Sequence, residues 1–497
     1  MLFLTAETIK AAETEAMKNV SSVQLIKNAA TACCEKIKHF ESVRIFCGKG
    51  NNGSDGYATA IMLKNLGKKV EIVQVFEPET NECIEFCEAA LSMGIPITKT
   101  LSYSAEKFDC VMDAIFGIGF TGVVTGRAEE AINIINSSNS YVVSADIPSG
   151  MIADSGSSSG ECVRADLTIT FTAPKKGMMF NSSVDLCGEI VVAEVGIPVD
   201  YNEQKSCIPI TDKLVKTMLP ERKRLSHKGT FGTVVMIAGS YGMAGAAAIS
   251  AQAAYKTGCG LVKIIAPISI CNILNIMIKE AVIIPVPEKN GIMLPELTEK
   301  AMQAIKKADS VLVGCGLGRG EHNKLIQNVL SATDAGVIID ADGINALCEN
   351  PEIIRNKNVL LTPHPLEFSR LISTSVMEIE NHRIKYADKF THEYGVSILL
   401  KGARSLVAYG GNNKYISLIS TSALAKAAMG DLLAGIIAAL AAQGLSLADS
   451  AACGCYIHAC AGLLAEKEIG AHSVMCDDIL TLMPRVIQNI LNKRPLM

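Results

Sequence analysis

The sequence predicts an α/β protein with more than one domain. Short runs rich in β-branched residues alternate with helical stretches along the chain, and most residues of these runs are apolar without a regular polar alternation. Continuously apolar strands are typical of parallel sheets covered by helices on both faces. The chain has 497 residues, more than one hydrophobic core usually holds at ~100–200 residues per domain. The predicted strands are residues 43–47, 70–76, 110–115, 141–145, 234–238, 310–314 and 337–340.

A polar stretch at residues 202–224 marks the expected boundary between two halves. A strand-like run at residues 190–195 ends in Gly-Ile-Pro, and a second glycine-rich sequence begins at Gly229. We therefore place the domains at residues 1–207 and 208–497. Each half opens with its own glycine-rich loop, which favours two independent nucleotide-type sites.

Composition excludes several classes of function. The formal net charge of −4 has no long run of one sign, and the chain has no Trp, so nucleic acid and anionic membranes are not expected partners. The longest apolar run, residues 432–442, is shorter than the ~20 residues of a membrane span. The first residues lack the basic start and extended apolar stretch of a signal peptide. We expect a cytoplasmic protein.

The 17 cysteines are expected to be small buried hydrophobes in a reducing compartment. Cys455, His458 and Cys460 come nearest to a zinc cluster. They lie in an apolar helical stretch without an evident fourth ligand, which favours burial over metal binding.

The first glycine-rich loop, residues 48–56, connects a predicted strand to a predicted helix. Its glycines match the G-x-G-x-x-G fingerprint, so an ordinary Rossmann oxidoreductase is the first interpretation. Two features argue against it: Asn51 and Asn52 occupy positions that normally hold small or apolar residues, and Asp55 places a carboxylate beside the helix N-terminus, where it repels a pyrophosphate. These polar residues are expected to form a site of their own.

Two further carboxylates follow predicted strands of the first half. Asp113 and Asp146 each end a strand and lead into a glycine-containing turn. Ligands of open α/β sheets collect at the carboxyl ends of strands, so Asn52, Asp113 and Asp146 could meet in one crevice. The alternative is that each carboxylate only caps the turn that follows it.

Three segments of the first half carry a specific resemblance to a known family: residues 50–56 (Gly-Asn-Asn-Gly-Ser-Asp-Gly), 112–119 (Met-Asp-Ala-Ile-Phe-Gly-Ile-Gly) and 146–151 (Asp-Ile-Pro-Ser-Gly-Met). In this order and spacing they resemble the NAD(P)H-hydrate epimerases, the YjeF N-terminal domain, over nearly all of residues 1–205. The resemblance implies a Rossmann-like three-layer sandwich that interconverts the R and S forms of hydrated NADH and NADPH.

The resemblance also implies a set of site residues. A potassium ion is expected at Asn52, Asp113 and Ser149, and oxygen-only donors suit a hard cation. Asp146 is expected to reach the hydrated ring as a catalytic residue. Inversion at C6 needs reversible loss of hydroxyl or ring opening, and a carboxylate suits either route. The implied contacts of the hydrated nucleotide are Asn51, Asn52, Gly53, Ser54, Asp55, Gly117, Ile118, Gly119, Phe120, Thr121, Gly122, Val123 and Asp146.

The second half contains a series of motifs at residues 239–246, 314–318, 338–347, 361–367, 399–404 and 429–435. The most informative is Gly430-Asp431 at the start of a long apolar helix. Backbone N–H groups there can hold a transferring phosphoryl group, and Asp431 can accept the proton of an attacking hydroxyl. An Asp at a helix start is otherwise an N-cap, but the other motifs, in their order, favour a catalytic base.

Together these motifs resemble the ADP- or ATP-dependent NAD(P)H-hydrate dehydratases, a branch of the ribokinase-like fold, over about residues 215–490. The epimerase-first order resembles the bacterial fusion enzymes, which use ADP. His364, between two prolines, is expected to contact substrate rather than to lie in the core. The implied hydrate contacts are Ala246, Gly316, His364 and Asp431. The implied nucleotide contacts are Lys401, Gly402, Ala403, Arg404, Ser405 and Gly430.

The resemblance implies that the nucleotide phosphorylates the hydrate hydroxyl and that phosphate is then eliminated to restore the dihydronicotinamide. The expected substrates are NADHX, NADPHX and ADP or ATP, with Mg²⁺ accompanying the nucleotide, and a homo-oligomer is expected. One departure concerns the phosphate loop, where Ala427-Ala428-Met429 replaces the usual Gly-Gly-Ser. A loop that needs positive φ would be strained by alanine or methionine. Two other interpretations stay open: a ribokinase-like vitamin or sugar kinase fused to a binding domain, and a non-catalytic nucleotide-binding protein.

Overall fold

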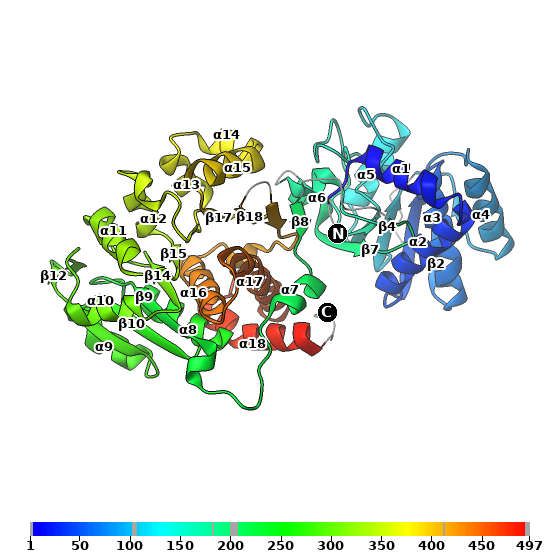
Figure 1. Cartoon of the computed structure of the whole chain (residues 1–497). Helices are drawn as coiled ribbons and strands as arrows, with labels where there is room; N and C mark the ends of the chain where they lie inside the picture. The colour runs from blue at the N-terminus through cyan, green and yellow to red at the C-terminus, as the bar shows by residue number, and fades with distance from the viewer. Residues whose placement is uncertain (1–2, 102–106, 181–182, 199–206, 411–412, 493–497) are drawn as a thin grey trace. The chain divides into compact units, whose positions relative to one another are not determined.

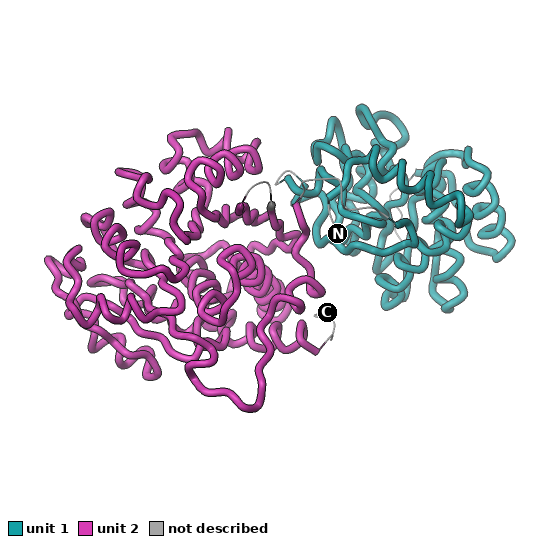
Figure 2. Tube along the Cα trace, viewed as in Figure 1, with its two compact units in different colours: residues 1–204 teal, residues 205–497 magenta. Residues whose placement is uncertain are grey.

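The chain divides into two compact units, residues 1–204 and 205–497 (Figure 2). The computed structural model describes residues 3–101, 107–180, 183–198, 207–410 and 413–492. Each unit is built around a large sheet of its own, with helices packed on it (Figure 1).

The first unit contains a seven-stranded sheet in which every neighbouring pair is parallel, in the order β3-β2-β1-β4-β5-β6-β7. The strand order reverses between β1 and β4, which in open α/β sheets opens a crevice at the carboxyl ends of the strands. Its strands are β1 (Ser42–Cys47), β2 (Lys69–Gln74), β3 (Ile97–Thr98), β4 (Cys110–Ala114), β5 (Tyr141–Ala145), β6 (Leu167–Phe171) and β7 (Glu189–Ala193).

Helices cover both faces of this sheet. One core joins the sheet to α2, α3 and α4, and a second core on the opposite face joins it to α5. The Rossmann-like three-layer architecture predicted from the sequence is thereby confirmed. The helices are α1 (Ala6–Ala16), α2 (Ser22–Ile37), α3 (Asn51–Asn65), α4 (Asn81–Ser92), α5 (Arg127–Asn136), α6 (Val184–Cys187) and the 3₁₀ helix η1 (Lys176–Met179).

The second unit contains a ten-stranded sheet, ordered β11-β10-β9-β14-β15-β16-β17-β18-β19-β8. The strands from β11 to β17 are parallel, whereas β18 is antiparallel to both of its neighbours. The strands are β8 (Cys207–Pro209), β9 (Thr233–Ile237), β10 (Leu261–Pro267), β11 (Val282–Val286), β14 (Ser310–Val313), β15 (Gly336–Ile339), β16 (Val359–Leu361), β17 (Ser397–Leu400), β18 (Leu406–Tyr409) and β19 (Asn413–Ile416), with a small separate hairpin of β12 (Glu288–Lys289) and β13 (Ile292–Met293).

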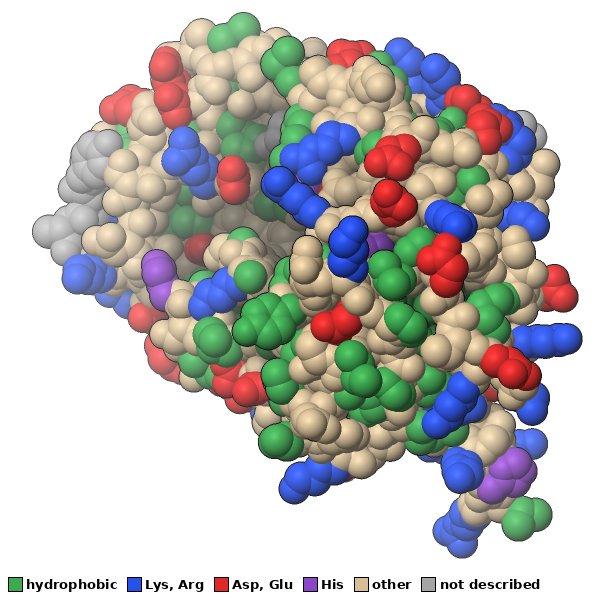
Figure 3. Space-filling view, turned by 90° about the vertical axis from the view of Figure 1, so that its left-hand side faces the viewer, with side chains coloured by type: hydrophobic (Ala, Val, Ile, Leu, Met, Phe, Trp, Pro, Cys, Tyr) green, Lys and Arg blue, Asp and Glu red, His purple; other side chains and the backbone are tan. Residues whose placement is uncertain are grey.

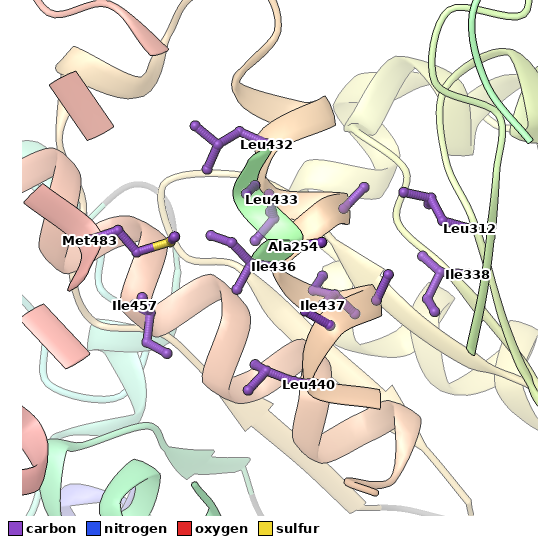
Figure 4. Packing of buried hydrophobic residues seen from close by; sticks show 14 of the residues in the cluster. Ala254, Leu312, Ile338, Leu432, Leu433, Ile436, Ile437, Leu440, Ile457 and Met483 are labelled. Atoms are coloured by element: carbon purple, nitrogen blue, oxygen red, sulfur yellow. The ribbon is translucent and has the colours of Figure 1, made fainter. Parts of the chain in front are cut away.

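Helix α16 (Met429–Ala442) lies at the centre of the second unit's core. Figure 4 shows its leucines and isoleucines packed between strand residues Leu312 and Ile338 and the neighbouring helices. The other helices are α7 (Asp212–Met218), α8 (Ala244–Thr257), α9 (Cys271–Met277), α10 (Glu299–Lys306), α11 (His322–Ala332), α12 (Asp342–Leu347), α13 (Pro365–Leu371), α14 (Val376–Asn381), α15 (Arg383–Tyr394), α17 (Leu447–Ile469) and α18 (Cys476–Asn492), with 3₁₀ helices η3 (Lys228–Phe231), η4 (Ile268–Ile270), η5 (Pro351–Ile354) and η6 (Ser422–Leu424).

Helix α17 is long and apolar enough to span a membrane by length and composition, and it was not singled out by the sequence. It is a core helix here, because 89% of its apolar window is buried inside the unit. Its apolar character follows from burial on all sides rather than from contact with lipid.

Every predicted strand coincides with an observed one, and the ends agree within two residues. The agreement reflects the continuous apolar runs that strands buried on both faces require. Figure 3 shows that on one face of the molecule Lys and Arg side chains lie among Asp, Glu and small hydrophobic patches. Such mixing accords with the small net charge.

The cysteines are all free thiols, and 14 of the 17 are buried. Cys455, His458 and Cys460 lie on α17 in the core, and they do not converge as a metal-binding group within the described residues. Burial lowers the pKa of His458 to about 4, so its imidazole stays neutral. The interpretation as buried core residues is therefore the better one for this trio.

We predict that the two units fold separately when the chain is divided at residues 204 and 205, because each has its own sheet and core. The cut must precede Cys207, because β8 pairs with β19 at the edge of the second sheet. A fragment of residues 205–497 should unfold cooperatively, whereas one of residues 213–497, which lacks β8 and the Thr211 cap of α7, should have a lower urea midpoint. Equal midpoints would show that β8 adds nothing to the fold.

Candidate active sites in the two units

The glycine-rich loop of the first unit is shaped by close backbone packing. Gly48 follows β1 and lies against the Ile115 carbonyl after β4, and Gly53 in α3 lies against the Gly48 carbonyl. A Cβ atom at either glycine would overlap these backbone atoms. The glycines therefore let the start of α3 approach the end of β4, which brings polar residues of α3 to the crevice.

Asp113 and Ser149 form a buried hydrogen-bonded pair at this crevice. The Ser149 hydroxyl donates to Asp113 Oδ1 at 2.6 Å, and the Ser149 amide donates to Oδ2 at 2.8 Å. The Ser144 hydroxyl donates to Oδ2 at 2.9 Å, and the Ile115 amide to Oδ1 at 3.2 Å. Burial raises the pKa of Asp113, while these hydrogen bonds oppose the rise. The carboxylate caps its own turn through Ile115 and also ties β4 to the turn after β5.

Asn52 joins this group through the Phe116 carbonyl. The Asn52 amide nitrogen donates to that carbonyl oxygen at 3.0 Å, and the Ser149 hydroxyl lies 3.4 Å from the same oxygen. Asn52 Oδ1 is buried and has no hydrogen-bond partner among the residues that the structure describes. A buried amide oxygen without a partner is costly, and it fits a site that takes a cation among oxygen donors.

Asp146 forms a buried ion pair with Lys175, a residue that the sequence did not single out. The Lys175 ammonium also donates to the Thr170 hydroxyl at 2.7 Å and to the Phe171 carbonyl at 3.0 Å. Asp146 adopts a positive φ of 67°, and its Oδ2 accepts the Ile118 amide at 3.3 Å. Its carboxylate is therefore directed to another loop and to Lys175 rather than capping its own turn.

The predicted substrate loop, residues 117–123, begins beside Asn52 and Asp146. A Cβ at Gly117 would lie 3.5 Å from both Asn52 Cβ and Asp146 Oδ2, so Gly117 sits between these two residues. The loop turns outward at its far end, where Val123 is 61% exposed and packs beside Gly160. In the predicted Asn51–Asp55 segment, Asn51 is exposed and the other four residues are buried.

In the second unit, the ends of three neighbouring strands meet at Asp340. Asp340 follows β15 and is 1% exposed, Thr362 follows β16, and Lys401 follows β17. The Thr362 hydroxyl donates to Asp340 Oδ1 at 2.7 Å, and the Lys401 ammonium donates to the same oxygen at 2.9 Å. Lys401 was predicted as a nucleotide contact, whereas the role of Asp340 in holding it was not predicted.

Asp431 faces this group from the first turn of α16. Side-chain ligand atoms of Cys315, Asp340 and Asp431 all lie within 4.8 Å of one another. Burial, together with the charge of Asp340, raises the pKa of Asp431 to about 6, against the opposing effects of Cys315 and Lys401. A Cβ at Gly430 would lie 3.4 Å from the Lys401 ammonium, so the predicted Gly-Asp pair adjoins the lysine.

Asp431 is not the cap of α16, because Ala428 holds that position without a side-chain cap bond. Ala428 has φ 65° and ψ −7°, in the left-handed region that alanine avoids. The strain expected from replacing Gly-Gly-Ser therefore falls on the second residue of the three. This left-handed conformation costs alanine about 1–2 kcal/mol relative to a residue, such as glycine, that adopts it freely.

The other predicted contacts lie around this site in different ways. A Cβ at Gly316, which has φ 63°, would lie 2.8 Å from Ala246 Cβ, so these two residues adjoin. His364 caps α13, where its Nδ1 accepts the amides of Leu366 and Glu367 at 3.1 and 3.3 Å. Burial and nearby Lys401 lower the pKa of His364, so a neutral imidazole is favoured.

The predicted nucleotide segment, residues 401–405, forms a tight turn after β17. Gly402 and Ala403 are exposed, and the Ser405 hydroxyl donates to the Gly402 carbonyl at 2.9 Å. Arg404 is fully buried, and its guanidinium donates to the Leu418 carbonyl at 2.6 Å. Its side chain is therefore turned inward, and the backbone of the turn is the part that faces outward.

The two sites fit the class of α/β enzymes, with carboxylates gathered at the carboxyl ends of the strands of two separate sheets. Residues 234–485 match the family described as NAD(P)H-hydrate dehydratase, and residues 22–177 match the family described as YjeF-related protein N-terminus. The second unit shares its fold with a ribokinase-like superfamily protein from Enterococcus faecalis, at 23% identity and a TM-score of 0.51, covering 60% of this chain and 99% of that one.

Full-length relatives match across both units. The chain is 33% identical to the bifunctional NAD(P)H-hydrate repair enzyme Nnr of Moorella thermoacetica over 494 residues, covering 95% of this chain and 93% of the relative. It is 32% identical to the enzyme of that name from Escherichia coli, covering 89% and 84%. The chain therefore belongs to the family of bifunctional NAD(P)H-hydrate repair enzymes.

We predict that Ala428→Gly stabilises the second unit by up to ~1 kcal/mol. Glycine removes the left-handed strain of about 1–2 kcal/mol, while its extra freedom in the unfolded chain costs about 0.5–1 kcal/mol. Urea unfolding followed by circular dichroism measures the change. Ala427→Gly is the matched control, because Ala427 has no positive φ and its replacement should be neutral or destabilising. A lower stability for Ala428→Gly would contradict the strain argument.

Proposed function

We propose that the chain repairs hydrated NADH and NADPH in two steps. The first unit epimerises the R and S hydrates, and the second unit dehydrates the S form at the expense of ADP, or of ATP. The main support is that the two family matches fall on separate units and that each match contains one of the two carboxylate sites.

In the second unit, Asp431 is the proposed base for the phosphoryl-transfer step. It takes the proton of the C6 hydroxyl as the hydroxyl oxygen bonds to the terminal phosphorus and the bridging oxygen leaves with the shortened nucleotide. A pKa of about 6 leaves the carboxyl ionised near neutral pH while keeping it basic enough to accept a proton. The C6–O bond then breaks with loss of phosphate, and loss of a proton from C5 forms the C5=C6 double bond of the dihydronicotinamide.

The other residues of this site are proposed to bind and orient the reactants. Ala246, Gly316 and His364 contact the hydrate, and residues 401–405 with Gly430 contact the nucleotide. The first amides of α16 face the transferred phosphoryl group and stabilise its negative charge. The Asp340–Lys401 pair holds the lysine toward Gly430. Mg²⁺ is proposed to bind with the nucleotide phosphates, since it usually retains waters and phosphate oxygens as ligands.

In the first unit, the proposed potassium ligands are Asn52, Asp113 and Ser149. The partnerless Asn52 Oδ1 and the Asp113 carboxylate support this assignment, because they supply oxygen donors that are already buried and close-packed. A bound cation would supply positive charge beside the hydrated nucleotide. Asp146, oriented by Lys175 and the Ile118 amide, is the proposed catalytic residue at the hydrated ring.

The predicted substrate contacts remain part of the proposal. They are Asn51 to Asp55 and Gly117 to Val123, with Asp146 between the two segments in the fold. Proposed partners are small molecules only: NADHX, NADPHX and the adenine nucleotide. We further propose that the protein is cytoplasmic, since α17, the one helix of the described residues that is long and apolar enough to cross a membrane, is a core helix. A homo-oligomer remains part of the proposal.

For the dehydratase site we predict that Asp431→Asn lowers kcat with the S hydrate by about 10²–10⁴-fold, because the variant keeps the shape but lacks the proton acceptor. In the wild type, kcat/KM should fall as pH drops through about 6, because the base must be ionised, and the variant should lose this dependence. The assay follows the returning absorbance of the dihydronicotinamide with ADP or ATP.

The matched control for this variant is Asp334→Asn, which removes an exposed charge at the opposite end of β15 and should leave the rate unchanged. Full activity of Asp431→Asn would assign proton transfer to another group. If the wild type were inactive with both ADP and ATP, the interpretation as a non-catalytic nucleotide-binding protein would be favoured.

For the cation site we predict that Asp113→Ala abolishes potassium-dependent epimerisation, because it removes a charged oxygen ligand. Dehydration of the S hydrate should be spared, since that reaction belongs to the other unit. Rates are compared in potassium chloride and in choline chloride. Asp109→Ala, at the other end of β4, is the control that should keep the potassium response. An unaltered potassium response of Asp113→Ala would refute the ligand assignment.

A further inference from the structure

A third carboxyl group of the first unit, that of Asp55, is buried without an evident partner. Asp55 lies on α3, one turn beyond Asn52, and is 8% exposed. Among the described residues no hydrogen bond reaches its carboxyl oxygens, in contrast to the four that reach Asp113. A buried carboxyl that lacks both a hydrogen bond and a cation is expected to retain its proton.

Helix α1 places another carboxylate near this group. The chain before α1 is fixed next to Lys175, because the Leu4 amide donates to the Pro174 carbonyl at 3.0 Å and the Lys176 amide donates to the Leu4 carbonyl at 2.9 Å. Ile9 and Ala16 mark the buried face of α1, and Glu13 lies on that face between them, one turn from each. Glu13 is half-buried there, and burial together with the charge of Asp146 raises its pKa, against the opposing charges of Lys175 and Lys10.

Burial and the neighbouring charged side chains favour the neutral form of Asp55. Burial raises its pKa well above the usual range, and the negative charges of Asp146 and Glu13 raise it further. The other titratable groups around it are the thiols of Cys33 on α2 and Cys83 on α4, whose own pKa values burial raises. The two lysines of the crevice lie elsewhere: Lys175 pairs with Asp146, and Lys10 of α1 lies beside Gly119.

We infer that Asp55 is the general acid of the epimerisation, acting opposite Asp146 on the same hydrated ring. The inference rests on the proposed epimerase site and adds a second catalytic residue to it. The two carboxyl groups differ in environment, since Asp146 is ion-paired with Lys175, whereas Asp55 forms no ion pair with any described residue. Two carboxyls in unlike surroundings are the usual arrangement for paired acid and base roles.

Either route of epimerisation uses this pair with balanced protons and electrons. In the hydroxyl-loss route, Asp55 gives its proton to the C6 oxygen and the C–O bond breaks with its electrons leaving on water. Water then adds to the cationic ring from the other face and loses its extra proton to Asp146. In the ring-opening route, Asp146 takes the hydroxyl proton, the C6–N1 bond breaks, and its electron pair takes the proton of Asp55 at N1. Closing on the opposite face returns both protons.

The test follows the ratio of R to S hydrate by chromatography without nucleotide, so that only epimerisation is measured. We predict that Asp55→Asn slows the conversion by about 10²–10⁴-fold and removes the loss of activity at high pH that deprotonation of an acid produces. Dehydration of the S hydrate by the same chain should be unchanged. An undiminished epimerisation rate in Asp55→Asn would overturn the inference. Asp146→Asn separates the two claims, since its full activity would instead overturn the proposed site.

Glu13→Gln tests the same inference without altering the acid itself. Removing the Glu13 charge lowers the pKa of Asp55, so the high-pH loss of epimerase activity should move to lower pH while the plateau rate is retained. Glu15→Gln is the matched control, because it removes an exposed charge from the same helix and should not move the profile. An unchanged pH profile of epimerisation in Glu13→Gln would contradict the role of Asp55. This test remains valid even if the Asp55→Asn variant does not fold.

Discussion

A carboxyl group taken out of water must find a partner or keep its proton, and both halves of this chain are organised around that constraint. Asp113 meets it with four hydrogen bonds, Asp146 with Lys175, and Asp340 with Lys401 and Thr362. Cys315 and Lys401 compensate the burial of Asp431 only in part, so its pKa is about 6. These carboxyls thus lie at the carboxyl ends of the strands of each sheet but differ in the partners that compensate their burial.

The partners of these carboxyls follow neighbouring strands, so the strand order of each sheet determines which side chains meet at the site. In the second unit, β15, β16 and β17 supply Asp340, Thr362 and Lys401 in spatial order. The core behind them is dominated by α16, whose apolar side chains contact strands and helices together. Packing fixes the first turn of that helix against the strand ends, and the helix tolerates a left-handed alanine there.

Much of the fold and part of the sites could be predicted from sequence because they depend on local patterns. Apolar runs indicated the strands, acids at strand ends indicated Asp113 and Asp146, and an acid at the start of a long apolar helix indicated Asp431. Lys175 and Asp340 were missed as partners, because an ion pair between strand ends depends on which strands are neighbours. A charged residue following the next strand of a parallel sheet is the signal that could have found them.

Other features depend on packing that no local pattern records. The position of Glu13 follows from the contact between Leu4 and the segment around Lys175, which are about 170 residues apart. Arg404 belongs to the expected nucleotide segment, yet its guanidinium is directed into the core, because the carbonyl that binds it lies beyond β19. Asn52 is identified by sequence, but only the fold shows that its side-chain amide oxygen lacks a hydrogen-bond partner among the described residues.

The edge strand β8 has a consequence for synthesis of the chain on the ribosome. Its partner β19 lies about 200 residues further along the sequence, after every other strand of the second sheet. At about 5–20 residues per second, β8 remains without its partner for roughly 10–40 s after it is made. During that interval the first unit is already complete in sequence and can fold. The second sheet therefore closes its last edge late, and a strand of only three residues offers little surface for wrong pairing in the meantime.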